Sequence, residues 1–230
     1  MRIILIRHGE SQANVDKNLH RILPDHEIAL SSLGKEQAIE AGKRLQQFYS
    51  DRYQTHWAKE GKWNPHIAVW NSPYRRTRET AALICEQLQM KRLTQLENVL
   101  LCEQQFGMFD GLEDKEIEQK FPEEFKSWQN NMKFKGKFWA RYPMGESPFD
   151  VAVRIKQSFS MLNETIDNIV VCHGTVAKLF PMMWFNHTPE WYADAKTIGN
   201  CGFYLIEDRK DVGWHFPGYK KGKLVQEHAE

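Results

Sequence analysis

The chain has 230 residues, a length that suits one α/β domain with a well-developed hydrophobic core. Its 31 Lys and Arg residues balance 30 Asp and Glu residues, so overall charge gives no reason to expect binding to nucleic acid or to an anionic membrane. Because the first predicted strand starts at residue 2, we expect no leader, and no apolar run approaches the roughly 18 residues that span a bilayer. We expect one cytoplasmic domain over residues 1–230, and we leave a homodimer open.

The cysteines give no sign of a metal site or a disulfide framework. None lies in a CxxC pair, and although Cys172 adjoins His173, neighbouring residues on a strand point to opposite faces. We therefore expect free thiols, mostly buried, at all four positions: Cys85, Cys102, Cys172 and Cys201.

The amino-terminal segment carries the first candidate site. The branched apolar residues 3–6 predict a short buried strand, which stops at Arg7, His8 and Gly9. Ligands of open α/β sheets bind beyond the carboxyl ends of parallel strands, so these residues would line such a crevice. We expect His8 to be a nucleophile there and Gly9 to let a ligand approach the backbone.

The next elements are predicted from capping residues and apolar spacing. Ser11 is a good cap for a turn of helix after the first strand, and Asn14 lies in the same turn. The serines at 31 and 32, followed by apolar residues at helical spacing, predict a helix that ends near residue 49. Residues 51–66 have no clear period and are predicted to be a surface excursion before a second buried strand at residues 67–70.

The helix after this second strand opens with three arginines. Arg75, Arg76 and Arg78 stand at the start of a predicted helix that runs to about residue 88. Positive charges at the amino end of a helix are unfavourable unless an anion is bound there, because the helix dipole is already positive at that end. The cluster indicates an anion site, with three solvated arginines as the plain alternative.

A third extended segment, residues 93–102, is predicted to end at Glu103. Residues 104–148 then form a predicted lid with two helices, one over residues 113–121 and one from Pro122. Basic and aromatic residues alternate near its end, a pattern that can also bind single-stranded nucleic acid, but the run is short and the chain is neutral.

The last third of the chain repeats the pattern of strand, polar terminus and helix. Ser147 caps a predicted helix through residue 162, and the apolar residues 169–172 predict a strand that ends at His173. A helix over residues 176–185, a strand over residues 202–207 and a polar tail over residues 213–230 complete the prediction. The repetition predicts a three-layer α/β domain with a mostly parallel sheet flanked by helices.

The strand-end residues suit a phosphate monoester. Phosphoryl transfer requires cations around the phosphoryl oxygens, an in-line nucleophile and a proton for the leaving oxygen. Arg7 and Arg76 offer paired donors, His8 the nucleophile, and His173 a further donor when protonated. Glu103 would supply the proton.

In this order the motifs resemble those of the histidine phosphatase superfamily, also called phosphoglycerate mutase-like. The resemblance covers roughly residues 1–206 and is carried by these segments: Arg7-His8-Gly9-Glu10-Ser11 with Asn14, Leu30-Ser31 with Gly34, Ser72-Pro73 with Arg76-Thr77 and Thr80-Ala81, Glu103, Gly145-Glu146-Ser147, and His173-Gly174. It implies a phosphoric monoester hydrolase in which the first histidine is phosphorylated and then hydrolysed, without a metal or another cofactor.

By motif, the resemblance implies that Arg7, Asn14, Arg76 and His173 bind the phosphoryl group and that Glu103 protonates the leaving group. The residues that we expect to contact the substrate are Asn14, Gly9, Ser11, Thr175, Arg141 and Tyr142. Lysines of the predicted lid, together with Lys178, could meet a second anionic group of the substrate.

Three functional interpretations compete within this resemblance. Residues 106–147 look most like fructose-2,6-bisphosphatase, but Gly174 and Lys178 stand where that enzyme has Gln and Arg. The proline-rich insertion of cofactor-dependent phosphoglycerate mutases is not found, so mutase activity is the weaker hypothesis. A non-catalytic protein that only binds phosphorylated ligands is disfavoured because His8, Arg76 and Glu103 are all present. We therefore predict a phosphatase for small phosphate monoesters with broad or moderately selective specificity.

Overall fold

The computed structural model describes residues 1–60, 66–216, 218–221 and 223–224. Its main feature is a six-stranded sheet with the order β3-β2-β4-β1-β5-β6. The first four strands in that order are parallel, whereas β5 and β6 run antiparallel to their neighbours. The strands are β1 (Arg2–Arg7), β2 (His66–Asn71), β3 (Arg92–Glu97), β4 (Asp167–Cys172), β5 (Phe203–Glu207) and β6 (Lys210–Phe216), and a separate ribbon contains β7 (Tyr219–Lys220) and β8 (Lys223–Leu224). This confirms the predicted α/β class with a mostly parallel sheet.

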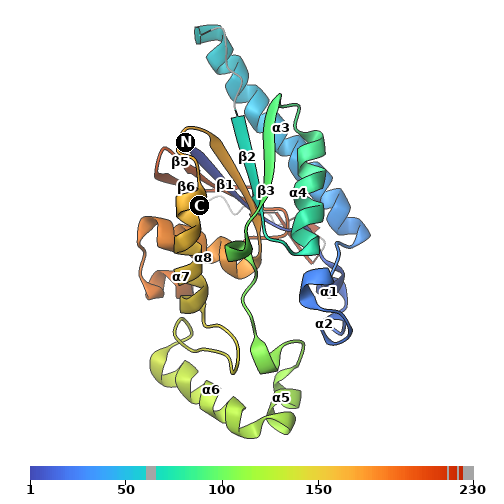
Figure 1. The fold of residues 1–230 in the computed structure, drawn as a ribbon, viewed down its shortest axis with the longest axis vertical. Coiled ribbons are helices and arrows are strands. Elements are labelled where there is room, and N and C mark those ends of the chain that lie inside the picture. The colour runs from blue at the N-terminus through green and yellow to red at the C-terminus, as the bar shows by residue number, and fades with distance from the viewer. Residues whose placement is uncertain (61–65, 217, 222, 225–230) are drawn as a thin grey trace.

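Helices cover both faces of the sheet (Figure 1). The long helices α3 and α4 lie on one face, and α7 and α8 on the other. The α-helices are α1 (Gln12–Val15), α2 (Leu19–Ile22), α3 (Ser32–Glu60), α4 (Arg75–Gln87), α5 (Asp114–Lys120), α6 (Pro122–Lys135), α7 (Pro148–Ser158), α8 (Gly174–Phe185) and α9 (Pro189–Asp194). Short 3₁₀ turns occupy Asp25–Glu27, Val99–Leu101, Gly107–Phe109 and Phe159–Met161.

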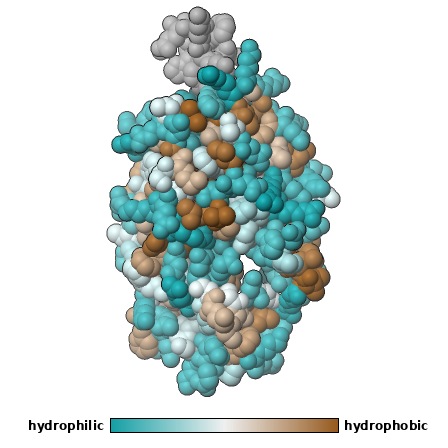
Figure 2. Space-filling model, viewed as in Figure 1, coloured by the Kyte–Doolittle hydropathy of each residue, from teal (hydrophilic) through white to brown (hydrophobic). Residues whose placement is uncertain are grey.

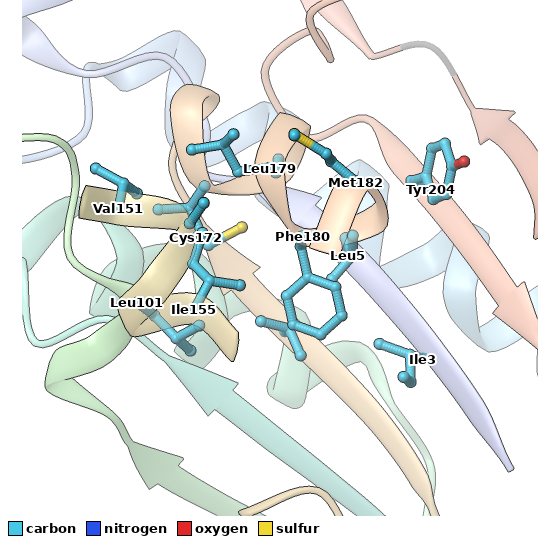
Figure 3. Packing of buried hydrophobic residues seen from close by; sticks show 14 of the residues in the cluster. Ile3, Leu5, Leu101, Val151, Ile155, Cys172, Leu179, Phe180, Met182 and Tyr204 are labelled. Carbon is cyan, nitrogen blue, oxygen red and sulfur yellow. The ribbon is translucent and has the colours of Figure 1, made fainter. Parts of the chain in front are cut away.

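Strand β1 is buried on both faces because it lies in the middle of the sheet. Its side chains alternate, so Ile3 and Leu5 join the core under α7 and α8, whereas Ile4 and Ile6 join the core under α3 and α4. Figure 3 shows the first of these cores, with Phe180 of α8 packed against the sheet. A strand buried on both sides is a rigid support for the residues that follow it.

The segment that carries α5 and α6 forms one end of the molecule, beyond the carboxyl ends of the parallel strands (Figure 1). It has a small core of its own, built from Phe109, Ile117 and Phe125, with Trp128 and Tyr142 packed against it. The aromatic residues of this cluster therefore pack against one another within the segment. Its lysines at positions 133, 135 and 137 are exposed.

Three predictions about secondary structure were wrong in their extent. Helix α3 continues to Glu60 where a surface excursion was expected over residues 51–66, and of that range residues 61–65 lie outside the described part. The sequence contains no Gly or Pro between residues 43 and 60, so the helix can propagate, and its far end extends past the sheet (Figure 1).

The polar tail predicted over residues 213–230 was also wrong, because β6 reaches Phe216 and a further ribbon follows. Asp208 and Arg209 join β5 to β6 with φ angles of 50° and 64°, the signature of a tight hairpin turn. The sequence Asp208-Arg209 is not the Asn-Gly or Asp-Gly pair that predicts such a turn. Residues 217, 222 and 225–230 lie outside the described part.

The third extended segment is shorter than predicted. Strand β3 ends at Glu97, and a 3₁₀ turn over Val99–Leu101 follows before Glu103. Helix α9 was not anticipated. By contrast, the capping predictions for Ser11 and Ser147 are confirmed, since both side chains accept a hydrogen bond from the backbone three residues later.

The surface and the thiols complete the description. The face drawn in Figure 2 is mostly hydrophilic, with apolar residues in small separate groups. No helix among residues 1–60 or in the later described segments is long and apolar enough to cross a membrane. All four cysteines are free; Cys172 and Cys201 are buried, and Cys85 and Cys102 are half-buried.

Candidate active site

His8 lies directly after β1, where its backbone is fixed by two neighbours. Its N–H donates to the carbonyl of Cys172 at 2.9 Å, which continues the ladder with β4. Its carbonyl accepts a hydrogen bond from Asn200 Nδ2, also at 2.9 Å. The side chain is only 4% exposed. The residue is thus held at a fixed position at the carboxyl edge of the sheet.

The hydrogen bonding of the His8 ring determines its reactive nitrogen. Nδ1 lies 2.7 Å from the carbonyl oxygen of Gly9, which can only accept, so Nδ1 carries the proton. Burial lowers the pKa of His8 well below its usual value, and the nearby Arg76 and Arg7 lower it further. The neutral ring therefore has its free lone pair on Nε2, which is the state a nucleophile needs.

His173 follows β4, the strand next to β1, and the two imidazoles meet edge to face with ring centroids 5.3 Å apart. His173 Nε2 lies 2.9 Å from Ser72 Oγ, while the buried Nδ1 has no hydrogen-bond partner in the described part of the chain. Burial lowers the pKa of His173 well below its usual value, with Arg76 as the next cause. The lowered pKa favours the neutral ring, and a bound dianion would favour its protonation.

Arg7 is the last residue of β1 and has one fixed contact, from Nη1 to the carbonyl of Ile198 at 3.0 Å. Its Nε is buried and has no partner in the described residues. Burial lowers the pKa of Arg7, an effect that Glu103 opposes and Arg76 increases. A buried guanidinium with an unsatisfied N–H is the kind of group that binds an oxyanion.

The three arginines at the start of α4 have different partners. Arg75 pairs with Glu79 and Arg78 pairs with Glu97, and both arginines are exposed on the surface. Arg76 is 5% exposed and lies close enough to lower the pKa of both histidines. The structure thus brings Arg76, and neither of its neighbours, to the strand-end site.

Glu103 reaches the same site from the other side. One carboxylate oxygen accepts from the N–H of Gln104 at 2.9 Å, and the other lies 3.4 Å from the N–H of Thr175 at the start of α8. A methyl group placed on Gly174 would lie 3.7 Å from the Arg7 guanidinium carbon and 3.9 Å from Glu103 Oε2. Gly174 therefore lies where the cation, the carboxylate and the second histidine converge.

Other predicted substrate contacts have structural partners. Gly9 donates its N–H to Thr80 Oγ1 at 3.1 Å, and a methyl group on Gly9 would lie 2.4 Å from the carbonyl oxygen of Gly34. The close approach that requires this glycine is therefore made by the chain itself, which corrects the expectation that a ligand makes it. Ser11 and Asn14 form a reciprocal capping box, and Asn14 Oδ1 is 3.4 Å from Asn200 Nδ2.

Two residues of the predicted set are not brought to the phosphoryl site. Arg141 is exposed and pairs with Asp150 near the start of α7. Tyr142 stacks on Trp128 within the small core of the α5–α6 segment, and burial raises its pKa. Thr175 is present at the site through its backbone N–H to Glu103.

Several residues that organise the site were not anticipated. Ser72 contacts His173, and Thr80 accepts a hydrogen bond from Gly9. The side-chain amide of Asn200 donates to the carbonyl of His8 and lies near Asn14 Oδ1. Asp25 pairs with Arg76 at 2.9 Å. Ser72 and Thr80 lie within the motifs around Arg76, so a signal existed for them. Asn200 and Asp25 stand in segments without a recognisable pattern, and only the folded chain brings them to the site.

Three or more His, Cys, Asp or Glu side chains do not gather in a metal-binding arrangement anywhere in the described residues. Fold and site together define a class: an α/β domain that places two buried histidines and two arginines at the carboxyl edge of a parallel sheet. The chain matches the family model of the histidine phosphatase superfamily (branch 1) over residues 3–216. It therefore belongs to this superfamily.

Known proteins support the assignment. The chain is 31% identical over 220 residues to phosphoglycerate mutase-like protein AT74H of Arabidopsis thaliana, covering 90% of this chain and 73% of that protein. It is 29% identical over 185 residues to fructose-2,6-bisphosphatase of Saccharomyces cerevisiae, covering 80% of this chain but only 34% of the yeast protein. A putative alpha-ribazole-5'-P phosphatase from Escherichia coli shares the fold, with a TM-score of 0.68 at 20% identity over 99% of both chains.

Proposed function

We propose that this chain is a metal-independent phosphatase that hydrolyses small phosphate monoesters through a phosphohistidine on His8. The observation that carries the proposal is the state of His8: a buried neutral imidazole with Nδ1 hydrogen-bonded to Gly9 and Nε2 free. Around it are buried polar atoms without hydrogen-bond partners in the described chain, Arg7 Nε and His173 Nδ1. Such groups are costly to bury unless a ligand satisfies them.

The proposed reaction has two steps. Arg7, Arg76 and His173 bind the phosphoryl oxygens while His8 Nε2 attacks phosphorus in line with the leaving oxygen. Protonated Glu103 donates its proton to that oxygen, and the alcohol departs. The Glu103 carboxylate then takes a proton from water, the hydroxide oxygen attacks phosphorus, and inorganic phosphate and free His8 are regenerated.

We propose small monoesters as substrates because the site offers no second preformed anion subsite at Arg141, which is engaged by Asp150. Lys178 lies over the ring of Tyr192 at 4.5 Å, and its pKa is lowered by burial and by Lys137. These two lysines could meet a second anionic group, so a bisphosphate preference is the competing proposal. The yeast relative named for fructose 2,6-bisphosphate gives it weight.

Substitution of the nucleophile tests the mechanism. His8→Ala should abolish hydrolysis of 4-nitrophenyl phosphate, and EDTA should leave wild-type activity unchanged. Substantial activity in the variant, or its loss with chelator, would refute the proposal. Wild-type protein that binds orthovanadate but turns over no ester would favour the non-catalytic alternative.

A substrate panel tests the specificity. We expect kcat/KM values for sugar phosphates, phosphoglycerates, nucleotides and a phosphopeptide to lie within about 100-fold of each other, equivalent to about 2.7 kcal/mol of differential transition-state binding. A larger preference for one sugar bisphosphate would replace the broad specificity with a dedicated metabolic role. The cytoplasmic location remains a prediction that imaging of the tagged full-length chain would test.

A further inference from the structure

The segment between α1 and α3 contains Asp25, whose carboxylate pairs with Arg76, the arginine that we propose binds the phosphoryl group. Asp25 Oδ1 accepts from Arg76 Nη1 at 2.9 Å, and Oδ2 accepts from Nη2 at 3.1 Å. The Asp25 carbonyl accepts a further bond from Nη1 at 2.7 Å. The pair is largely buried, with side-chain exposures of 5% for Arg76 and 22% for Asp25.

These bonds leave a defined part of the guanidinium for another ligand. An arginine has five N–H groups, and Asp25 accepts from three of them: both on Nη1 and one on Nη2. The remaining two, Nε–H and the second Nη2–H, lie along one edge with the spacing that binds an oxyanion in bidentate fashion. No other hydrogen bond of Arg76's guanidinium is found among the residues that the structure describes.

Asp25 also carries its charge at every working pH. Burial by itself raises the pKa of Asp25, but contacts with His20 and Arg76 outweigh it and bring the pKa to about 2. His20 Nδ1 lies 3.3 Å from Asp25 Oδ1, and this carboxylate raises the pKa of His20. A permanent negative charge therefore offsets the repulsion between Arg76 and Arg7.

The segment that contains Asp25 is anchored to the rest of the domain. This argues against the alternative that Asp25 occupies the anion site of Arg76 and is displaced when substrate binds. Ile28 and Leu30, three and five residues later, are 0% and 2% exposed. The Leu30 N–H donates to Glu79 Oε2 of α4 at 2.8 Å. Because the same α4 carries Arg76, the carboxylate and the guanidinium are held on one framework and stay together when a ligand arrives.

We propose that Asp25 is the positioning residue of Arg76: it binds the end of the guanidinium and thereby directs the Nε–Nη2 edge toward the phosphoryl group on its way to His8. The inference rests on the proposed function, since the anion at that edge is the ester phosphate. It assigns the segment over residues 16–28 a part in the site that no motif indicates. Asp25 itself touches neither substrate nor reacting atoms.

The test is a double-mutant cycle with kcat/KM for 4-nitrophenyl phosphate as readout. Asp25→Asn keeps the size of the side chain and removes its charge, and we expect a loss of about 10- to 100-fold. In an Arg76→Ala background the same substitution should cost less than about twofold, because its target is gone. Glu27→Ala is the matched control: an exposed acidic residue of the same turn, in contact with His26, whose loss should leave activity unchanged.

Inhibition by orthovanadate adds a readout that a purely structural role would not move. The vanadate inhibition constant should rise by the factor by which kcat/KM falls, when both are measured well below the melting temperature of the variant. Should Asp25→Asn not fold, Asp25→Glu keeps the charge but not the bidentate geometry and should show a smaller loss in the same cycle. Equal losses with and without Arg76, or tighter vanadate binding in the variant, would overturn the inference.

Failure of the proposed function would look different. In that case the wild type would show no turnover, and direct titration with vanadate would replace kinetics. Weaker binding by Asp25→Asn than by wild type would then still support the positioning role, and equal binding would refute it.

Discussion

The most informative prediction concerns the proton that Glu103 supplies. In Glu103→Gln the side chain keeps its size, and its remaining oxygen can still accept from the N–H of Gln104, which is 2.9 Å away in the wild type. The other backbone contact, at 3.4 Å to Thr175, is long and contributes little. The fold should therefore survive, and the chemical effect should be the loss of the transferable proton.

The size of the effect depends on the leaving group. General acid catalysis contributes about 10²- to 10⁴-fold, so Glu103→Gln should lower kcat/KM for an alkyl phosphate such as glycerol 3-phosphate by about that factor. For 4-nitrophenyl phosphate the loss should stay below about tenfold, because nitrophenolate departs without a proton. The ratio kcat/KM is the right quantity, since it reports steps up to the phosphorylation of His8 and not the later hydrolysis.

Glu10→Gln is the matched control for this experiment. Glu10 adjoins the nucleophile, but its carboxylate accepts a hydrogen bond from Ser31 Oγ at 2.9 Å and so has a structural partner. We expect both substrates to be affected equally and by less than about tenfold. Equal losses on both substrates in Glu103→Gln, or a leaving-group dependence in Glu10→Gln, would refute the assignment of the acid.

Two further predictions concern stability. Because burial and the two site arginines lower the pKa of His8, the unfolded chain binds a proton there that the folded chain does not. The free energy of unfolding should therefore fall as pH drops below about 6.5, by at most about 1.4 kcal/mol per pH unit for this residue, and urea titrations of His8→Asn should show a shallower slope between pH 6.5 and 5. An unchanged slope would contradict the buried neutral state. In the core, Phe180→Ala should lower the free energy of unfolding by about 3 to 5 kcal/mol, since this ring is 0% exposed, whereas Phe134→Ala, at 77% exposure, should change it by less than about 0.5 kcal/mol. Similar losses in both variants would show that the packing in Figure 3 is not what stabilises the fold.

Local patterns were sufficient to predict the main elements of the domain. The apolar residues of β1 and β4 are short, branched and uninterrupted, which is the pattern of strands buried on both faces, and the structure confirms both strands. Ser147 and Pro148 predict the start of α7 at the observed residue, because capping depends on a few adjacent positions. The positions of His8 and His173 follow from the same logic, since each directly follows the last residue of a strand.

Features that depend on distant segments needed the tertiary structure. The position of the three arginines at the start of one helix did not distinguish them, and only the motif indicated Arg76; the structure shows that Glu79 and Glu97 pair with the other two. The hairpin to β6 was missed because its turn consists of Asp208 and Arg209. Positive φ angles cost conformational energy for residues other than glycine, so this pair does not predict a turn.

The chemistry of the site divides in the same way. The sequence determined which groups are available, because motifs are local and residue types fix what a side chain can donate or accept. The tertiary structure decided their states: the proton on His8 Nδ1, the neutral histidines and the bond between Asp25 and Arg76. These states arise from burial and from charges that the fold brings together. Asp25 and Arg76, for example, are more than 50 residues apart in the chain, and no local sequence pattern predicts such a contact.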